Sequence, residues 1–106
     1  MPAFDGTEFQ GPMDIDQLPN LPGVYLIVTD ASGGVKILGA YAAEDAKASA
    51  ASNPRRECWQ KNRKDSDPVA YFREERDLGK RQELVFGIHQ RRFYGLVCSE
   101  LPKDDF

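Results

Sequence analysis

The stretch that most constrains the fold is LPGVYLIVTDASGGVKILGAY, which spans residues 21–41. Residues 24–29 are β-branched, aliphatic or aromatic, which is typical of a strand. The break that follows contains Gly33 and Gly34, and glycines supply the positive φ angles that a hairpin turn needs. Residues 35–39 then form the returning strand. Because both runs are almost continuously apolar, we expect the hairpin to be covered on both faces, and helices are the elements left to cover it.

The composition changes abruptly after the hairpin. An alanine-rich segment, AAEDAKASAAS, predicts a helix that ends at Asn53-Pro54, and Pro54 can open a second short helix. Residues 69–72 predict a third strand, and Asp77 offers an N-cap for a last helix. This order predicts an α+β fold with a small, mostly antiparallel three-stranded sheet flanked by helices, β-β-α-β-α. Five residues of the last helix share one face at helical spacing: Leu78, Gln82, Val85, Phe86 and His89.

The length of 106 residues is that of one domain. Residues 1–20 show no clean period and contain three prolines and two glycines, so we expect an N-terminal arm or a loosely packed lead-in. The domain proper spans residues 21–99, and residues 100–106 form an acidic tail. Residues 93–98 are either a fourth short strand or an apolar return. Three apolar residues can dock the arm: Met13, Ile15 and Leu18.

The chain carries the composition of a soluble globular protein, with 29% charged and 41% hydrophobic residues. No apolar stretch approaches the roughly 18 residues of a membrane span, and the first residues lack the features of a secretory signal. We therefore expect a cytoplasmic monomer that does not enter a membrane. Two cysteines, Cys58 and Cys98, are too few for a disulfide framework, so we expect reduced thiols that pack as small hydrophobic side chains.

Two tripeptides of the hairpin resemble the signature tripeptides of the GIY-YIG endonuclease superfamily: Gly23-Val24-Tyr25 and Ile37-Leu38-Gly39. The proline before Gly23 is similar too, and so is the order of a helix directly after the second glycine, a strand, and a helix with a glutamate near its start. In that family an aromatic residue follows this glutamate after eleven residues, which is the spacing of Glu83 and Tyr94. The resemblance covers residues 22–95 and implies a GIY-YIG-like fold.

The resemblance also implies a set of catalytic roles. Tyr25 would help to activate a water, Lys47 would bind the phosphate, and Glu83 would hold one divalent metal ion, usually Mg²⁺. Such a set cuts a DNA strand by in-line attack on phosphorus. Charge that develops on the phosphate oxygens needs a cation and a metal, and the nucleophile needs a proton acceptor nearby.

Two positions depart from the family pattern. Lys47 stands where the family has an arginine, and a lysine cannot make the bidentate fork of a guanidinium to a phosphate. Ile37 replaces a tyrosine and has no proton to give or accept. Tyr41 follows Gly39 by two residues and should share its face of the sheet. These departures predict a divergent member with weak or lost cleavage; if active, it is a metal-dependent DNA endonuclease.

A basic segment, RRECWQKNRK, follows the first helix. Basic residues interleaved with an aromatic side chain can grip a nucleic-acid backbone, and they can equally form a solvated helix face with the tryptophan packed inward. The net charge of −3 argues against strong non-specific binding to nucleic acid. The candidate nucleic-acid-binding residues are Arg55, Arg56, Lys61, Arg63 and Lys64.

Two functions from different classes stay open. The first is a domain that processes or binds nucleic acid, with DNA as partner. The second is a catalytically inactive module that contacts a protein partner through the acidic arm and the hairpin. Glu83 has glycines four residues before and after it, at Gly79 and Gly87, which are its neighbours on the helix surface. These glycines either leave the carboxylate unobstructed or allow another backbone to pack there.

Overall fold

The computed structural model describes residues 3–4, 6–91 and 96–99. They form an α+β fold built on a four-stranded antiparallel sheet with the strand order β3-β6-β4-β5, and β1 and β2 pair separately as a two-stranded sheet. The elements in chain order are β1 (Ala3–Phe4), β2 (Thr7–Glu8), β3 (Gln10–Met13), the 3-10 helix η1 (Ile15–Gln17), β4 (Gly23–Ala31), β5 (Gly34–Ala43), α1 (Ala46–Ala51), α2 (Arg56–Lys61), β6 (Val69–Glu74) and α3 (Leu78–Arg91).

The predicted hairpin is confirmed. β4 pairs with β5 in antiparallel register from Gly23 opposite Ala43 to Ala31 opposite Gly34, with an irregularity after Ile27. The turn glycines have φ angles of 88° and 149°, a region that glycine enters without steric cost. β4 also pairs with β6 along its other edge, so the motif-bearing strand is central in the sheet.

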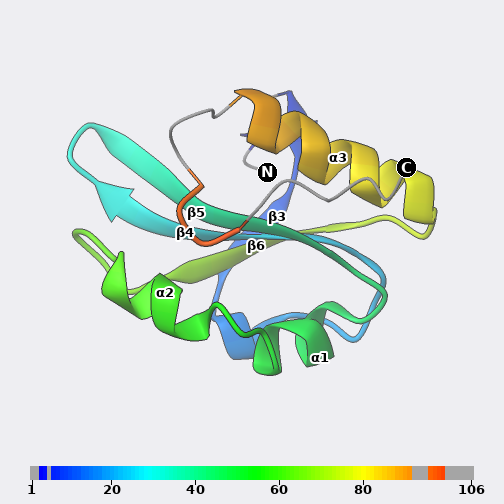
Figure 1. Cartoon of the computed structure of the whole chain (residues 1–106), viewed down its shortest axis with the longest axis horizontal. Helices are drawn as coiled ribbons and strands as arrows, with labels where there is room; N and C mark the ends of the chain where they lie inside the picture. Colours follow the sequence, from blue (N-terminus) through cyan, green and yellow to red (C-terminus); the bar gives the residue numbers. More distant parts are fainter. Residues whose placement is uncertain (1–2, 5, 92–95, 100–106) are drawn as a thin grey trace.

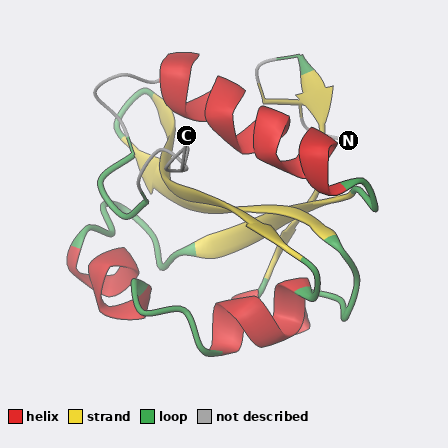
Figure 2. Cartoon of the chain, turned by 45° about the vertical axis from the view of Figure 1, so that its right-hand side comes forward, coloured by secondary structure: helices red, strands yellow, loops and turns green. Residues whose placement is uncertain are grey.

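Helices cover both faces of the sheet, as the apolar hairpin predicted. Figures 1 and 2 show α3 on one side of the sheet and α1 and α2 on the other. Alternate side chains of β4 therefore enter two separate cores. Val24 and Leu26 pack with Val85 on the α3 side, and Tyr25 packs with Trp59 on the other side.

The sheet has one strand more than the sequence predicted. β3, from the stretch expected to be a loosely packed lead-in, pairs with β6 through Gln10 opposite Phe72 and Met13 opposite Ala70. An edge strand tolerates the missing backbone N–H of Pro12, so the proline did not exclude a strand there. Apolar side chains hold this part of the chain in place, and Met13, Ile15 and Leu18 dock as predicted.

The helix ends and the start of α3 follow the predicted signals, but α1 begins at Ala46 and not at Ala42, because β5 continues to Ala43. In addition, α3 turns a different face to the sheet. The Asp77 carboxylate accepts a hydrogen bond from the Lys80 backbone N–H at 3.0 Å, which confirms the predicted N-cap. Leu78 and Phe86 are 55% and 37% exposed, so the predicted face is wrong for them, whereas Val85 and His89 on that face are buried. The buried residues of α3 are Arg81, Val85, Ile88 and His89, at helical spacing.

Arg81 explains why the sequence misplaced this face. Its guanidinium is buried and donates to the backbone carbonyls of Glu75 and Arg76, at 3.1 and 3.2 Å. A search for apolar residues at the helical spacing of 3.6 residues passes over an arginine, because a charged side chain is expected to face solvent. None of the helices in the described part of the chain has the length and apolar character that crossing a bilayer requires.

Candidate functional site

The tyrosine of the first tripeptide lies in a polar cluster beneath the sheet. Tyr25 points from the central strand β4 toward α1, where its hydroxyl lies 2.8 Å from the Ser49 Oγ and accepts a hydrogen bond from the Asn53 amide at 3.0 Å. Tyr41 lies directly opposite on β5, and the two rings stack with centroids 5.1 Å apart. The Trp59 indole N–H donates to the Tyr41 hydroxyl at 2.9 Å.

Burial keeps both phenols protonated. Desolvation raises the pKa of Tyr25, although hydrogen bonds from Ser49 and Asn53 oppose the shift. The same effect raises the pKa of Tyr41 to about 12, against the hydrogen bond from Trp59. Neither side chain is therefore a phenolate near neutral pH, and each is a hydrogen-bonding group rather than a ready proton acceptor for water.

An open cleft of about 410 Å³ lies next to this cluster. We call it the Tyr41 cleft. Its walls come from β5, from α1 and its connection to α2, from α3 and from residue 99. Hydroxyls, amides and one guanidinium face it, and none of the described residues that line it is a carboxylate. The polar lining residues are Tyr41, Ser49, Asn53, Arg55, Gln82 and Ser99.

The structure does not bring the three predicted catalytic residues together. Tyr25 packs on the α1 side of the sheet, whereas Glu83 lies on α3, which covers the opposite side. Glu83 lines a different cavity, of about 440 Å³, together with Lys80 and Arg73. Lys47 is exposed on α1 and lines neither cavity. Tyr94, the aromatic partner in the motif spacing, lies outside the described residues.

The α3 residue in the Tyr41 cleft is Gln82, one position before the predicted glutamate. Successive helical residues point about 100° apart, so a single step moves a side chain from one cavity to the other. No close packing explains the glycines around Glu83. A Cβ at Gly87 would meet no atom within 4 Å, and one at Gly79 would meet only the Asp77 carboxylate at 3.2 Å.

Packing accounts for the two motif glycines. A Cβ at Gly23 would collide with the Arg73 carbonyl oxygen and the Phe72 ring. A Cβ at Gly39 would lie 2.5 Å from the Tyr41 hydroxyl oxygen and 2.8 Å from two of its ring carbons. Tyr41 therefore folds back over Gly39, on the face that the sequence predicted. Ile37 points to the other side of the sheet, into the α3 core, because the strand pairing shifts after Ile27.

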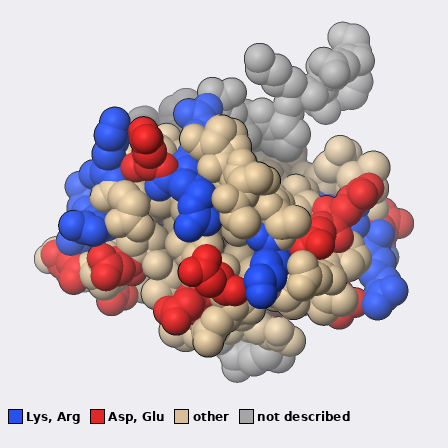
Figure 3. Space-filling view, turned by 90° about the horizontal axis from the view of Figure 1, so that it is seen from below, with Lys and Arg blue, Asp and Glu red and all other residues tan. Residues whose placement is uncertain are grey.

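The basic segment is not an uninterrupted cationic surface. Arg56 donates to the Ala50 carbonyl at 2.7 Å and lies over the Trp59 ring, which is 1% exposed. Arg63 forms a salt bridge of 3.3 Å with Asp67. Lys61 and Lys64 are exposed. Lys and Arg are interspersed with Asp and Glu over the α1–α2 side of the molecule (Figure 3).

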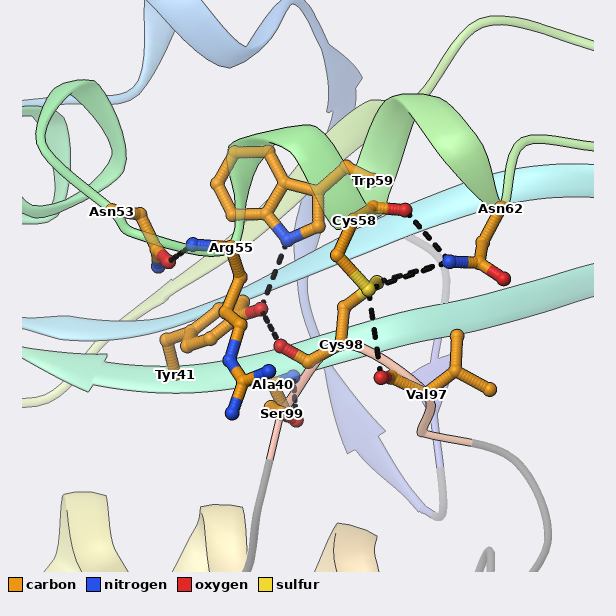
Figure 4. Close-up of a disulfide and its surroundings, with 10 residues drawn as sticks. All are labelled: Ala40, Tyr41, Asn53, Arg55, Cys58, Trp59, Asn62, Val97, Cys98 and Ser99. Atoms are coloured by element: carbon orange, nitrogen blue, oxygen red, sulfur yellow. Dashed lines mark hydrogen bonds between the residues drawn. A yellow bond between two sulfur atoms is a disulfide. The ribbon is translucent and has the colours of Figure 1, made fainter.

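The expectation of reduced thiols is wrong. Cys58 on α2 and Cys98 form a disulfide with an S–S distance of 2.09 Å (Figure 4). Their separation of 40 residues hides the pairing in the sequence, and two cysteines alone do not indicate a disulfide framework. Disulfides are typical of oxidising compartments, so this bond does not favour the predicted cytoplasmic location. That location stays a prediction.

Within the described residues, no group of three or more His, Cys, Asp or Glu side chains is placed to hold a metal ion. Comparison of the chain with family models, curated proteins and solved structures finds no match. The chemistry of the Tyr41 cleft, which is rich in hydrogen-bond donors and has no carboxylate on its described walls, is therefore the main guide to function.

Proposed function

We propose that this chain is a GIY-YIG-like domain that has lost phosphodiester cleavage and binds nucleic acid in the Tyr41 cleft. The observation that carries the proposal is the lining of the cleft. Mg²⁺ in phosphoryl-transfer sites is held by one or two carboxylates together with substrate phosphates. The described walls of the cleft offer hydroxyls, amides and a guanidinium instead. Such groups make the phosphate and sugar contacts of nucleic-acid-binding proteins.

The charges around the cleft support contact with only a short stretch of phosphate backbone. Arg55 lines the cleft at the start of α2, and Lys61 and Lys64 are exposed farther along the same basic segment. The overall charge of −3 and the interspersed acids oppose a long contact with a phosphate backbone. We expect two or three phosphate contacts. A plot of the logarithm of the binding constant against the logarithm of the salt concentration should then have a slope of about −2.

Two glutamines on α3 allow a matched test. Gln82 lines the cleft, and Gln90 is exposed on the same helix without lining it. Gln82→Glu and Gln90→Glu each add one negative charge. We expect Gln82→Glu to weaken binding of a labelled 20-mer DNA at least fivefold in fluorescence anisotropy, and Gln90→Glu to leave it within twofold. Equal effects of the two variants would remove the Tyr41 cleft from the proposal.

Plasmid nicking with Mg²⁺ or Mn²⁺ tests the loss of cleavage. We expect no nicking above that of a protein-free control. Nicking that disappears in Glu83→Gln would show instead that the carboxylate on α3 is part of an active centre, and the proposed loss would be wrong.

A catalytically inactive protein-interaction module is the second candidate. Leu78 and Phe86 are exposed at i and i+8 on α3, and Gln82 lies between them at the edge of the cleft. Aromatic side chains are enriched in the cores of protein interfaces, so Phe86 and Leu78 would be the anchors of such a contact. If DNA binding is undetectable at low salt, this second function takes the place of the first.

A further inference from the structure

The segment 96–99, which we call the strap, lies along the outer edge of β5. The Cys98 backbone N–H donates to the Leu38 carbonyl at 2.9 Å, and the Ala40 N–H donates to the Ser99 Oγ at 3.1 Å. The strap thus satisfies backbone groups of an edge strand that would otherwise be unpaired there. Ser99 also lies 2.9 Å from the His89 Nε2 on α3.

The strap is also part of the Tyr41 cleft. Ser99 lines the cleft, and the Tyr41 hydroxyl donates to the Cys98 carbonyl while it accepts from the Trp59 indole (Figure 4). Two of the aromatic side chains beside the cleft are therefore held in place through a carbonyl of the strap. Displacing the strap removes one wall and frees the ring that gives the cleft its shape.

Besides the backbone itself, a disulfide between Cys98 and Cys58 on α2 joins the strap to the domain. Cys98 is fully buried, whereas Cys58 is only partly buried, so a reagent from solvent reaches the Cys58 sulfur first. Without this bond the described contacts of the strap are a few hydrogen bonds, each of which contributes little against water, and the packing of Leu96 and Cys98.

We propose that the Cys58–Cys98 disulfide is a redox latch that holds the strap against β5, so that reduction by a dithiol opens the Tyr41 cleft and weakens its ligand binding. The binding consequence rests on the proposed function, whereas release of the strap does not.

Reduction of the latch proceeds by thiol–disulfide exchange with the dithiol. A thiolate of the dithiol attacks the Cys58 sulfur, the S–S bond breaks, and the Cys98 thiolate leaves and takes a proton from water. The second thiol of the reagent then displaces Cys58, which takes the second proton. The protein disulfide gains two electrons and two protons, and the dithiol becomes a disulfide. A reducing compartment therefore favours the released strap, and an oxidising one favours the strap held against β5.

The chain provides its own reporter, because Trp59 is its single tryptophan and lies next to Cys58. With dithiothreitol added to the full chain, we expect the tryptophan emission to shift to longer wavelength. We also expect amide exchange at Ala40 and Cys98 to become at least tenfold faster, while the amides of β4 stay protected. A Cys58→Ala/Cys98→Ala variant should match the reduced protein and should not respond to the reagent.

DNA binding by the oxidised and the reduced chain completes the test. We expect reduction to weaken binding at least threefold. Unchanged exchange at Ala40 and Cys98 would overturn the latch. Protection at Ala40 and Cys98 that stays equal to that of β4 in the reduced protein would overturn it too, since the bond would then be a staple of the whole domain. Faster strap exchange with unchanged binding would overturn the link to the cleft. Binding that is absent in both states would refute the proposed function, while the exchange result would still decide the latch.

Discussion

Gly39→Ala provides the most direct test of the packing around the second tripeptide. The added methyl group would lie 2.5 Å from the Tyr41 hydroxyl oxygen and 2.8 Å from two ring carbons. All three of the nearest atoms belong to Tyr41, so the ring has to leave its position. It then loses its stacking on Tyr25 and its hydrogen bonds to Trp59 and to the Cys98 carbonyl.

The size of the effect follows from these contacts. The two hydrogen bonds contribute about 1 kcal/mol each, and the stacked pair about 0.5–1.5 kcal/mol beyond its buried area. We therefore expect Gly39→Ala to lower the free energy of unfolding by about 3 kcal/mol. For a domain near this size that corresponds to a fall in melting temperature of roughly 10–20 °C.

A double-mutant cycle measured by chemical denaturation isolates the cause. In a Tyr41→Ala background the obstructing ring is absent, so adding Gly39→Ala should change the free energy of unfolding by no more than about 0.5 kcal/mol. The coupling between the two sites should then be close to the full cost of the single glycine substitution. If Gly39→Ala is as destabilising without the Tyr41 ring as with it, the steric account is wrong.

Three further changes test other parts of the structure. Replacing Cys58 and Cys98 together by Ala should lower the free energy of unfolding by about 4 kcal/mol in denaturant titrations, because a cross-link across about 40 residues restricts the unfolded chain by that amount. Thermal melts should show stability falling between pH 10 and about pH 12, and Tyr41→Phe should reduce this fall. The unfolded chain releases the phenolic proton near pH 10 while the folded chain keeps it to about 12, so unfolding releases a proton in this range and is favoured as pH rises. Gly87→Ala should raise stability by about 0.5–1 kcal/mol, since a Cβ there meets no atom within 4 Å and alanine favours the helix; a loss of stability would contradict the open space.

The local features of the fold could be predicted from the sequence because local chemistry dictates them. Strand propensity and the turn glycines located the hairpin, the Asp77 carboxylate capped α3 as expected, and the Asn53-Pro54 step ended α1. The apolar character of both hairpin strands predicted helices on both faces. In each case the residues that determine the feature lie within a few positions of one another.

Features that depend on distant contacts were missed. β3 is recognisable only through its partner β6, about 60 residues later, because its own sequence, QGPM, has weak strand propensity. The disulfide joins residues 40 positions apart, and no local pattern marks it. The inward side chain of Arg81 depends on carbonyls in the turn before α3. These contacts exist only after the chain has folded.

In the candidate site, the residue that matches the motif spacing is not the residue that lines the cleft. The eleven-residue step from Glu83 to Tyr94 matches a family pattern, but the residue that enters the Tyr41 cleft is Gln82. The spacing of residues in the sequence determines neither which side of a helix faces a cleft nor where the register of two strands shifts. The helical spacing places Gln82 on one face of the last helix, but no signal in the sequence marks it as part of a site.

Close packing requires the glycines of the two tripeptides. Gly23 lets β4 approach the Arg73 carbonyl and the Phe72 ring, and Gly39 lets Tyr41 lie back over β5. Both requirements are steric and hold whether or not the domain cleaves a phosphodiester bond. A chain under selection only for this fold would keep both glycines while the groups around them changed. The tripeptides are therefore better indicators of how the hairpin packs than of catalysis, and evidence for catalysis has to come from the side chains that line the cleft.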